Sequence, residues 1–209
     1  DHHIGVERAE TSSTSSQVWN YIQTGEFKET FTQGKKPRAK VLINDCDPDV
    51  CLSEFLLKNA SALQEASKPV ARKLHEIVTI TNELDVRGGI SDSPPESDIM
   101  QTQAWIYEPY AEFRMSGEID KKDPKAYKEV IAQVEKRIIQ TLEGKGEKKK
   151  LDTRYEVVER ESSVAMVKEI GFDARTQMHQ DNIDVFASVT EVGDDKLRVT
   201  LGKLSSEKP

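Results

Sequence analysis

Two short clusters of metal-ligating side chains stand out near the start of this chain. The chain opens with Asp1-His2-His3, and a second cluster, Asp45-Cys46-Asp47-Pro48-Asp49, follows an apolar run. Carboxylates and imidazoles are the ligands that Mn²⁺, Fe²⁺ and Zn²⁺ favour. If both clusters lie at one edge of a sheet, they can hold a pair of metal ions, and hydrolysis is the chemistry that such a pair supports.

Asp47 and Asp49 carry most of this argument, and each has a second interpretation. Closely spaced carboxylates repel each other, so the pKa of one must rise unless a cation neutralises them. Aspartate is also a preferred N-cap, so either residue can instead cap the helix that follows. The histidines beside Asp1 favour a metal, because neutral imidazole binds borderline transition metals. The alternative is that the opening triplet is incidental or the remnant of a tag.

The apolar pattern around the acidic cluster predicts a strand, a turn and a helix. Residues 40–44 form a compact apolar run, which is typical of a strand buried on both faces in a parallel sheet. A helical pattern starts at about residue 52, so the acidic cluster falls at the carboxyl edge of the expected sheet. Three- and four-residue apolar spacing predicts further helices at residues 18–22, 60–84 and 98–113. Within residues 60–84, a break between two helices at Pro69 is the alternative to one continuous helix.

The second half of the chain changes character after a clear amphipathic helix over residues 125–142. Residues 144–150 are charged and contain glycine, which indicates a solvated connector; a basic patch for nucleic acid is the alternative. The last sixty or so residues predict a small module of two strands, a helix and two strands. Its strands are expected at residues 155–159, 164–170, 183–190 and 197–201, with the helix opening after Gly171.

These patterns predict an α/β protein with a mainly parallel sheet flanked by helices, plus a smaller α+β C-terminal domain. The expected boundaries are residues 1–120 for the metal-binding domain, 121–150 for a connecting helix and linker, and 151–209 for the small domain. A chain of 209 residues suits this division. We expect the site in the cleft between the two domains, where ligands commonly bind.

Composition limits the partners and the cellular location that we expect for this chain. A net charge of −7 makes it a poor general binder of polyanions. No apolar run approaches the ~18 residues of a membrane span, so we expect no membrane partner and a cytoplasmic location. The only cysteines, Cys46 and Cys51, are too few for a disulfide framework, and we expect both to be reduced. A homodimer is compatible with this composition.

The chain resembles the DHH family of metal-dependent phosphoesterases. The resemblance rests on the triplet Asp1-His2-His3, the Ser/Thr-rich helix start at residues 12–19, and the acidic segment at residues 44–53, which is similar to the family's His-and-paired-Asp motif. The C-terminal module, through residues 171–175 and 199–203, is similar to the substrate-binding domain associated with that family. The motif order is rearranged, and Asp45 or Asn44 stands near the place of the expected histidine.

The resemblance implies a site with two Mn²⁺ ions and a set of ligands and catalytic groups. The implied metal ligands are Asp1, His2, Asp45, Asp47, Asp49 and Asp85, with a turn residue as the alternative for Asp85. The implied catalytic residues are His3 and Asp47. The implied substrate-binding residues are Ser53 and Arg175, with a surface salt bridge as the alternative for Arg175.

The activity implied is Mn²⁺-dependent hydrolysis of a phosphoester or phosphoanhydride in a nucleotide-like substrate. The partner is then a phosphorylated small molecule or a short oligonucleotide. Two alternatives stay open. One is a non-catalytic relative that binds a phosphorylated ligand, and the other is a structural protein in which the acidic segment only caps helices.

Overall fold

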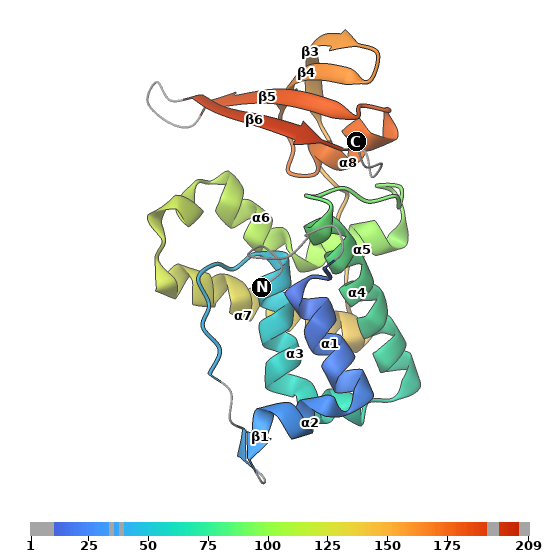
Figure 1. Ribbon diagram of the computed structural model, residues 1–209, viewed down its shortest axis with the longest axis vertical. Helices are drawn as coiled ribbons and strands as arrows, with labels where there is room; N and C mark the ends of the chain where they lie inside the picture. Colours follow the sequence, from blue (N-terminus) through green and yellow to red (C-terminus); the bar gives the residue numbers. More distant parts are fainter. Residues whose placement is uncertain (1–10, 34–35, 38–39, 192–196, 205–209) are drawn as a thin grey trace.

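The computed structural model describes residues 11–33, 36–37, 40–191 and 197–204. The described chain is mixed α and β, as expected: a group of helices lies below a four-stranded sheet in Figure 1. The helical part contains α1 (Thr14–Thr24), α2 (Glu26–Phe31), α3 (Pro48–Gln64), α4 (Lys68–Val86), α5 (Asp98–Ile106), α6 (Glu108–Met115), the 3₁₀ helix η2 (Glu118–Lys121) and α7 (Pro124–Leu142).

Helix starts in this part follow the local sequence closely. Proline occupies the first turn of α3, α4, α6 and α7, where its missing N–H costs no hydrogen bond. Ser13 caps α1 by accepting the N–H of Ser16 at 3.3 Å, and Asp123 caps α7 by accepting the N–H of Lys125 at 2.9 Å. Helices occur where apolar spacing predicts them, but residues 60–84 divide between α3 and α4, and residues 98–113 divide between α5 and α6.

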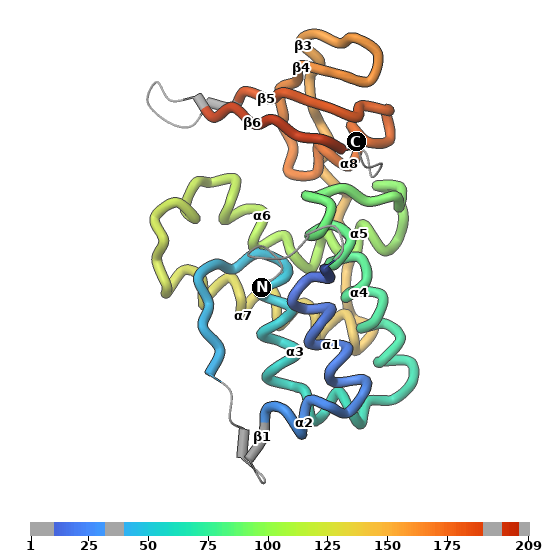
Figure 2. Tube along the Cα trace, in the orientation of Figure 1, coloured from blue at the N-terminus to red at the C-terminus, as the bar shows by residue number. Residues whose placement is uncertain are grey.

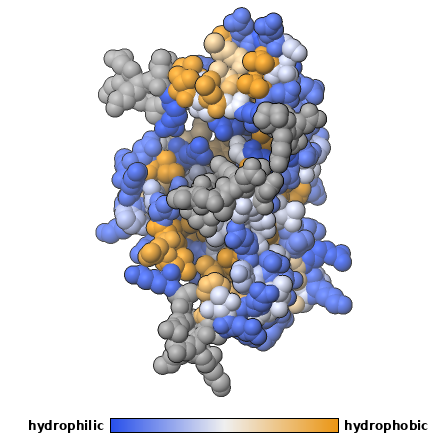
Figure 3. Space-filling model, viewed as in Figure 1, coloured by the Kyte–Doolittle hydropathy of each residue, from blue (hydrophilic) through white to orange (hydrophobic). Residues whose placement is uncertain are grey.

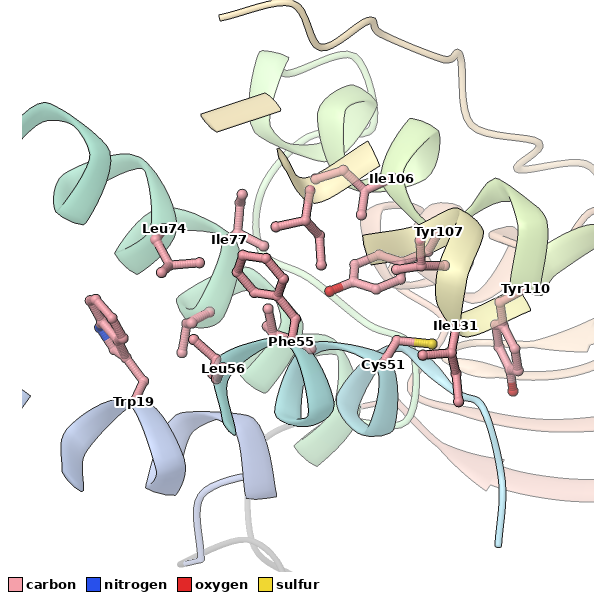
Figure 4. Close-up of a cluster of buried hydrophobic side chains, with 14 of the residues drawn as sticks. Trp19, Cys51, Phe55, Leu56, Leu74, Ile77, Ile106, Tyr107, Tyr110 and Ile131 are labelled. Carbon is pink, nitrogen blue, oxygen red and sulfur yellow. The ribbon is translucent and has the colours of Figure 1, made fainter. Parts of the chain in front are cut away.

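One apolar core joins α1, α3, α4 and α7 to the segment that carries α5 and α6. Figure 4 shows this core from Trp19 of α1 at one end to Tyr110 of α6 at the other. Phe55 and Leu56 of α3 lie between them and are at most 3% exposed. The helix α7 also belongs to this core, because Val134, Ile138 and neighbouring apolar residues on its inner face are buried. The domain division at residues 120 and 150 stays a prediction.

The strand expected at residues 40–44 is wrong. This segment has no ladder partner among the described residues, and Val41, Leu42 and Ile43 are 47%, 81% and 37% exposed. The β structure described in this half is a two-stranded antiparallel ladder of β1 (Thr32–Gln33) and β2 (Lys36–Pro37). The mainly parallel sheet is therefore not found within the described part of residues 11–120. A short apolar run becomes a buried strand only when neighbouring strands pair with it.

The C-terminal part confirms the predicted order of two strands, a helix and two strands. It consists of β3 (Tyr155–Glu161), β4 (Val164–Glu169), α8 (Ala174–Gln180), β5 (Val185–Glu191) and β6 (Leu197–Lys203). The sheet order is β3-β4-β5-β6. The β4 and β5 strands are parallel and connected through α8, whereas the two outer pairs are antiparallel. The inner face packs on α8 through Val167, Phe186 and Met178, among others.

The connector after α7 lies against the helices. Figure 2 shows the trace leaving α7 and running past α5 to the sheet. The N–H of Lys149 donates to the carbonyl oxygen of Gln101 at 3.0 Å, and its ammonium pairs with Glu108. Lys148 pairs with Asp98 at 2.7 Å. These two lysines therefore neutralise acidic residues of α5 and α6, which favours the connector interpretation over a basic patch.

Candidate functional site

Four of the predicted metal ligands come together at the ends of two helices. Asp47 is the N-cap of α3, Asp45 precedes it, Asp49 lies in the first turn of α3, and Asp85 lies in the last turn of α4. We call these four residues the acidic cluster. Burial raises the pKa of Asp47 to about 6, against the opposing hydrogen bond from Val50, and the charges of the other three carboxylates raise it further.

Two members of the acidic cluster cap helices. The Oδ1 atom of Asp47 accepts the N–H of Val50 at 2.8 Å. Asp49 caps α1 rather than its own helix: its Oδ2 accepts the N–H of Thr14 at 2.9 Å and its Oδ1 accepts the N–H of Ser15 at 2.8 Å. The capping interpretation is therefore confirmed for Asp47, whereas Asp49 accepts N–H groups of α1 instead of capping the helix that follows it. It fixes the start of α1 against the start of α3, and the partial positive charge at both N-termini favours the carboxylates.

Asp45 bends back on its own segment. Its Oδ1 accepts the N–H of Cys46 at 2.6 Å, which holds the carboxylate next to the start of α3.

Cys46 and Cys51 are reduced and buried, as expected, and the Cys51 thiol donates to the carbonyl oxygen of Cys46 at 3.1 Å. Burial, with help from Asp45 and Asp47, raises the pKa of Cys46 to about 12. Both thiols thus stay protonated at neutral pH and are poor metal ligands.

Two tyrosines without a predicted role, Tyr107 and Tyr110, lie close enough to the acidic cluster for its charges to affect their hydroxyl groups. Burial raises the pKa of Tyr110 to about 12, and the charges of Asp47 and Asp45 contribute to that rise. Burial also raises the pKa of Tyr107 well above its usual range, and its hydroxyl lies 3.3 Å from Thr81 Oγ1. Figure 4 shows Tyr107 beside Cys51 in the core. Both tyrosines lie in one predicted helical stretch of the sequence. Helical periodicity alone assigns tyrosines in such a stretch to the apolar core and gives no reason to place them beside the aspartates.

Ser53, a predicted substrate-binding residue, lies one helical turn after Asp49 on the same side of α3. Its side chain is buried, with 7% of the residue exposed. The hydroxyl oxygen makes no hydrogen bond with the described residues. The structure thus places Ser53 next to the acidic cluster, in the packed layer beneath it, and its contact with a substrate stays a prediction.

Arg175, the other predicted substrate-binding residue, is held by an ion pair. Its Nε lies 3.0 Å from Glu169 Oε2, and its Nη1 donates to the carbonyl oxygen of Gly88 at 3.4 Å. Ser188 donates to the same Glu169 carboxylate at 2.6 Å. The contacts of Arg175 therefore match the alternative interpretation of this residue, a salt bridge. Together with the hydrogen bond from Thr176 to the carbonyl oxygen of Gly89, it ties α8 to the loop after α4.

The remaining predicted residues, Asp1, His2 and His3, lie outside the described residues. Within the described ranges, no group of three or more His, Cys, Asp or Glu side chains has the arrangement of a metal site. The acidic cluster is thus a gathering of charges that lacks a complete ligand set among the residues the structure describes. Any metal bound there needs ligands from elsewhere or a small rearrangement.

None of the helices in the described part of the chain is both long and apolar enough to cross a lipid bilayer. Comparisons with protein-family models, with curated proteins and with solved structures give no match for this chain.

Proposed function

We propose that this chain is a Mn²⁺-dependent phosphoesterase whose metal ions are held by the acidic cluster together with the N-terminal triplet. The observation that supports the proposal is the convergence of four carboxylates from the start of α3 and the end of α4. In this proposal the enzyme is cytoplasmic, and its substrate is a phosphorylated small molecule or a short oligonucleotide. We place the proposed site between the helical part and the small α+β part.

The chemistry of the donor set fits a hard or borderline divalent cation. Carboxylate oxygens are the ligands that Mn²⁺ prefers in proteins, and a cation offsets the crowding that raises the pKa of Asp47. An ionised carboxylate has about four lone-pair sites, so a single capping bond leaves Asp47 able to bind a metal. Asp49 accepts N–H groups on both oxygens, which suits it to positioning α1 more than to ligation.

The N-terminal triplet is within reach of the acidic cluster. Only residues 4–10 separate it from Thr11, and a chain of that length spans at most about 30 Å. The start of α1 is fixed against Asp49 by two hydrogen bonds, from the N–H groups of Thr14 and Ser15. His2 as a ligand and His3 near the scissile phosphate remain part of this proposal.

Bound Mn²⁺ would supply a water molecule of lowered pKa and would stabilise the charge that develops on the phosphoryl group. The chain itself would supply two things. Asp45, Asp47 and Asp85 would hold the cation together with the N-terminal triplet, and Tyr107 and Tyr110 would close the site on the core side. Both tyrosines keep their protons at neutral pH, because burial raises the pKa of each hydroxyl.

The proposal is tested by metal content and turnover in wild type and two matched variants. Asp47→Asn removes a charge from the acidic cluster and keeps a good N-cap, because asparagine caps about as well as aspartate. Asp123→Asn makes the same change at the N-cap of α7, outside the acidic cluster. We expect wild type and Asp123→Asn to bind Mn²⁺ and to hydrolyse bis(p-nitrophenyl) phosphate. Equal Mn²⁺ stoichiometry in Asp47→Asn would refute the assignment.

A second candidate is a non-catalytic relative that binds a phosphorylated ligand. The capping role of Asp49 favours it, because that carboxylate already accepts two N–H groups and is less suited to metal ligation. The same experiment separates the candidates. Mn²⁺ or nucleotide binding without turnover supports the non-catalytic protein. Absence of metal, ligand binding and turnover supports a protein in which the aspartates only cap helices.

A further inference from the structure

The outer face of the C-terminal sheet is apolar and exposed. Side chains alternate along each strand, so the residues between those that pack on α8 point to the opposite face. There, Val164 is 51% exposed, Val199 is 63% exposed and Leu201 is 80% exposed. Figure 3 shows hydrophobic residues gathered over this sheet. We call this surface the outer sheet face; it comprises Val164, Met166, Val185, Ala187, Val189, Val199 and Leu201.

The outer sheet face is hollowed at its centre. A groove of about 590 Å³ runs across β4, β5 and β6, and Met166, Ala187 and Leu201 are among its lining residues. No element in the described part of the chain packs on it. An apolar surface that continues across three strands of one sheet is unusual on a monomer and indicates an interaction site.

The charges at the rim of this face follow the strand register. Glu161 pairs with Val164, Val164 with Val185, and Val185 with Lys203, so one row across the sheet begins with a carboxylate and ends with an ammonium group. The next row begins with Glu159 and continues through Met166 and Ala187 to Leu201. The β3 edge of the face is thus acidic, and the β6 edge carries Lys203. The centre is apolar except at one end, where Lys168 of β4 is exposed and has Glu156 as its ladder partner.

We propose that the outer sheet face binds the same face of a second copy of this chain, with a two-fold axis parallel to the strands. That rotation places β3 of one copy over β6 of the other at the same level along the strands. Glu161 then faces Lys203 of the second copy, and the apolar rows meet between these two contacts. The result is a sandwich of two aligned sheets, a common packing of β structure.

The charges also select this occupant and this axis. A two-fold axis across the strands would place β3 over β3 and bring Glu159 and Glu161 against their own copies, which is repulsive. An anionic membrane surface or a nucleic acid would meet the same glutamates and a chain of net charge −7. A second copy of the chain brings an opposite charge to both ends of this row, Glu161 and Lys203. A polyanion can pair only with Lys203.

The size of the face sets the strength of the dimer. Four strands at about 4.8 Å spacing, with five or six residues each at about 3.3 Å rise, give a face about 19 Å on a side. Face-to-face contact over this square covers roughly 360 Å² per copy, well below the ~800 Å² per partner of a standard interface. We therefore expect a reversible dimer that forms with increasing concentration.

Sedimentation velocity over a concentration series tests this proposal. Wild type is expected to shift from monomer to dimer as its concentration rises. Leu201→Lys should abolish the shift. Leu42→Lys is the matched control, because Leu42 is 81% exposed and lies in the helical part, away from the sheet. Leu42→Lys should behave as wild type.

Charge reversal tests the axis separately. Glu161→Lys and Lys203→Glu should each raise the dimer dissociation constant about tenfold, because each brings like charges together. The double variant Glu161→Lys/Lys203→Glu restores opposite charges and should recover wild-type association. Overturning results are a monomer at every concentration, an unchanged dimer in Leu201→Lys, or no recovery in the double variant. Far-ultraviolet circular dichroism confirms that each variant is folded, and none of these results depends on metal binding.

Discussion

The substitution Asp47→Asn should stabilise the metal-free protein at neutral pH. Burial and three acidic neighbours destabilise the ionised form of Asp47. They raise its pKa to about 6 from a usual value near 3.8. An amide at this position carries no charge and still presents an oxygen to the N–H of Val50. The variant thus removes the electrostatic penalty and retains the cap.

The magnitude follows from linkage between protonation and folding. Between pH 4 and pH 6 the folded protein holds the Asp47 proton and the unfolded chain releases it, so stability falls as pH rises through this window. The shift of about two pKa units corresponds to about 3 kcal/mol, fully lost above pH 6. This shift is already the net result of burial and charge repulsion against the favourable hydrogen bond from Val50 at the start of α3. The expected gain is therefore about 3 kcal/mol at pH 7.5 and close to zero at pH 4.

Urea unfolding at pH 4, 6 and 7.5 in the presence of EDTA measures this difference. Asp123→Asn is the control, because Asp123 caps α7 outside the acidic cluster. Its stability relative to wild type should stay nearly constant over the same range. The reasoning is refuted if Asp47→Asn is no more stable than wild type at pH 7.5, or if its advantage does not shrink as the pH falls to 4. With Mn²⁺ added, the order should reverse, because only wild type gains binding energy.

Three further predictions concern contacts around the acidic cluster and α8. Asp49→Ala should cost about 2 kcal/mol in the free energy of unfolding, because it leaves two N–H groups at the start of α1 without acceptors; Asp49→Asn, with one acceptor oxygen, should fall between. Arg175→Met should lower the free energy of unfolding by about 1–2 kcal/mol, because it leaves Glu169 without its cation. The double variant Glu169→Gln/Arg175→Met should recover part of this loss. Equal stability of the single and double variants would contradict the ion pair. Inorganic phosphate should bind only when Mn²⁺ is present, and calorimetric binding without metal would count against the proposed site.

The helices and the C-terminal module were predictable because their signals are local. Proline in first turns, serine or aspartate before apolar runs, and three- and four-residue spacing depend on neighbours within one element. The C-terminal strands were predictable for a similar reason. Their alternation survives in the structure, with Ala165 and Val167 buried on the α8 face and Val164 and Met166 exposed on the other.

The failure at residues 40–44 has a tertiary cause. An apolar pentapeptide has the propensity of a strand, but a strand exists only where another backbone pairs with it. The described residues offer no such partner, and Leu42 is 81% exposed. The sequence likewise could not show that Asp49 caps α1, because its two donors, Thr14 and Ser15, lie more than thirty positions earlier in the chain. Long-range pairing was the missing information in both cases.

The charge balance of the acidic cluster decides which kind of ligand it favours. The starts of α1 and α3 both meet the cluster, and each contributes a partial charge of about +0.5, whereas the end of α4 contributes about −0.5. Arg114, which donates to the Tyr110 hydroxyl at 3.4 Å, adds one positive charge nearby. The carboxylates supply up to four negative charges, so the total stays near −2 or −3 at neutral pH. A bare phosphate would be repelled from such a site, and a divalent cation would bring it close to neutrality. If the acidic cluster binds a phosphorylated ligand, it therefore does so through a cation, and the helix N-termini alone are too weak to hold the anion.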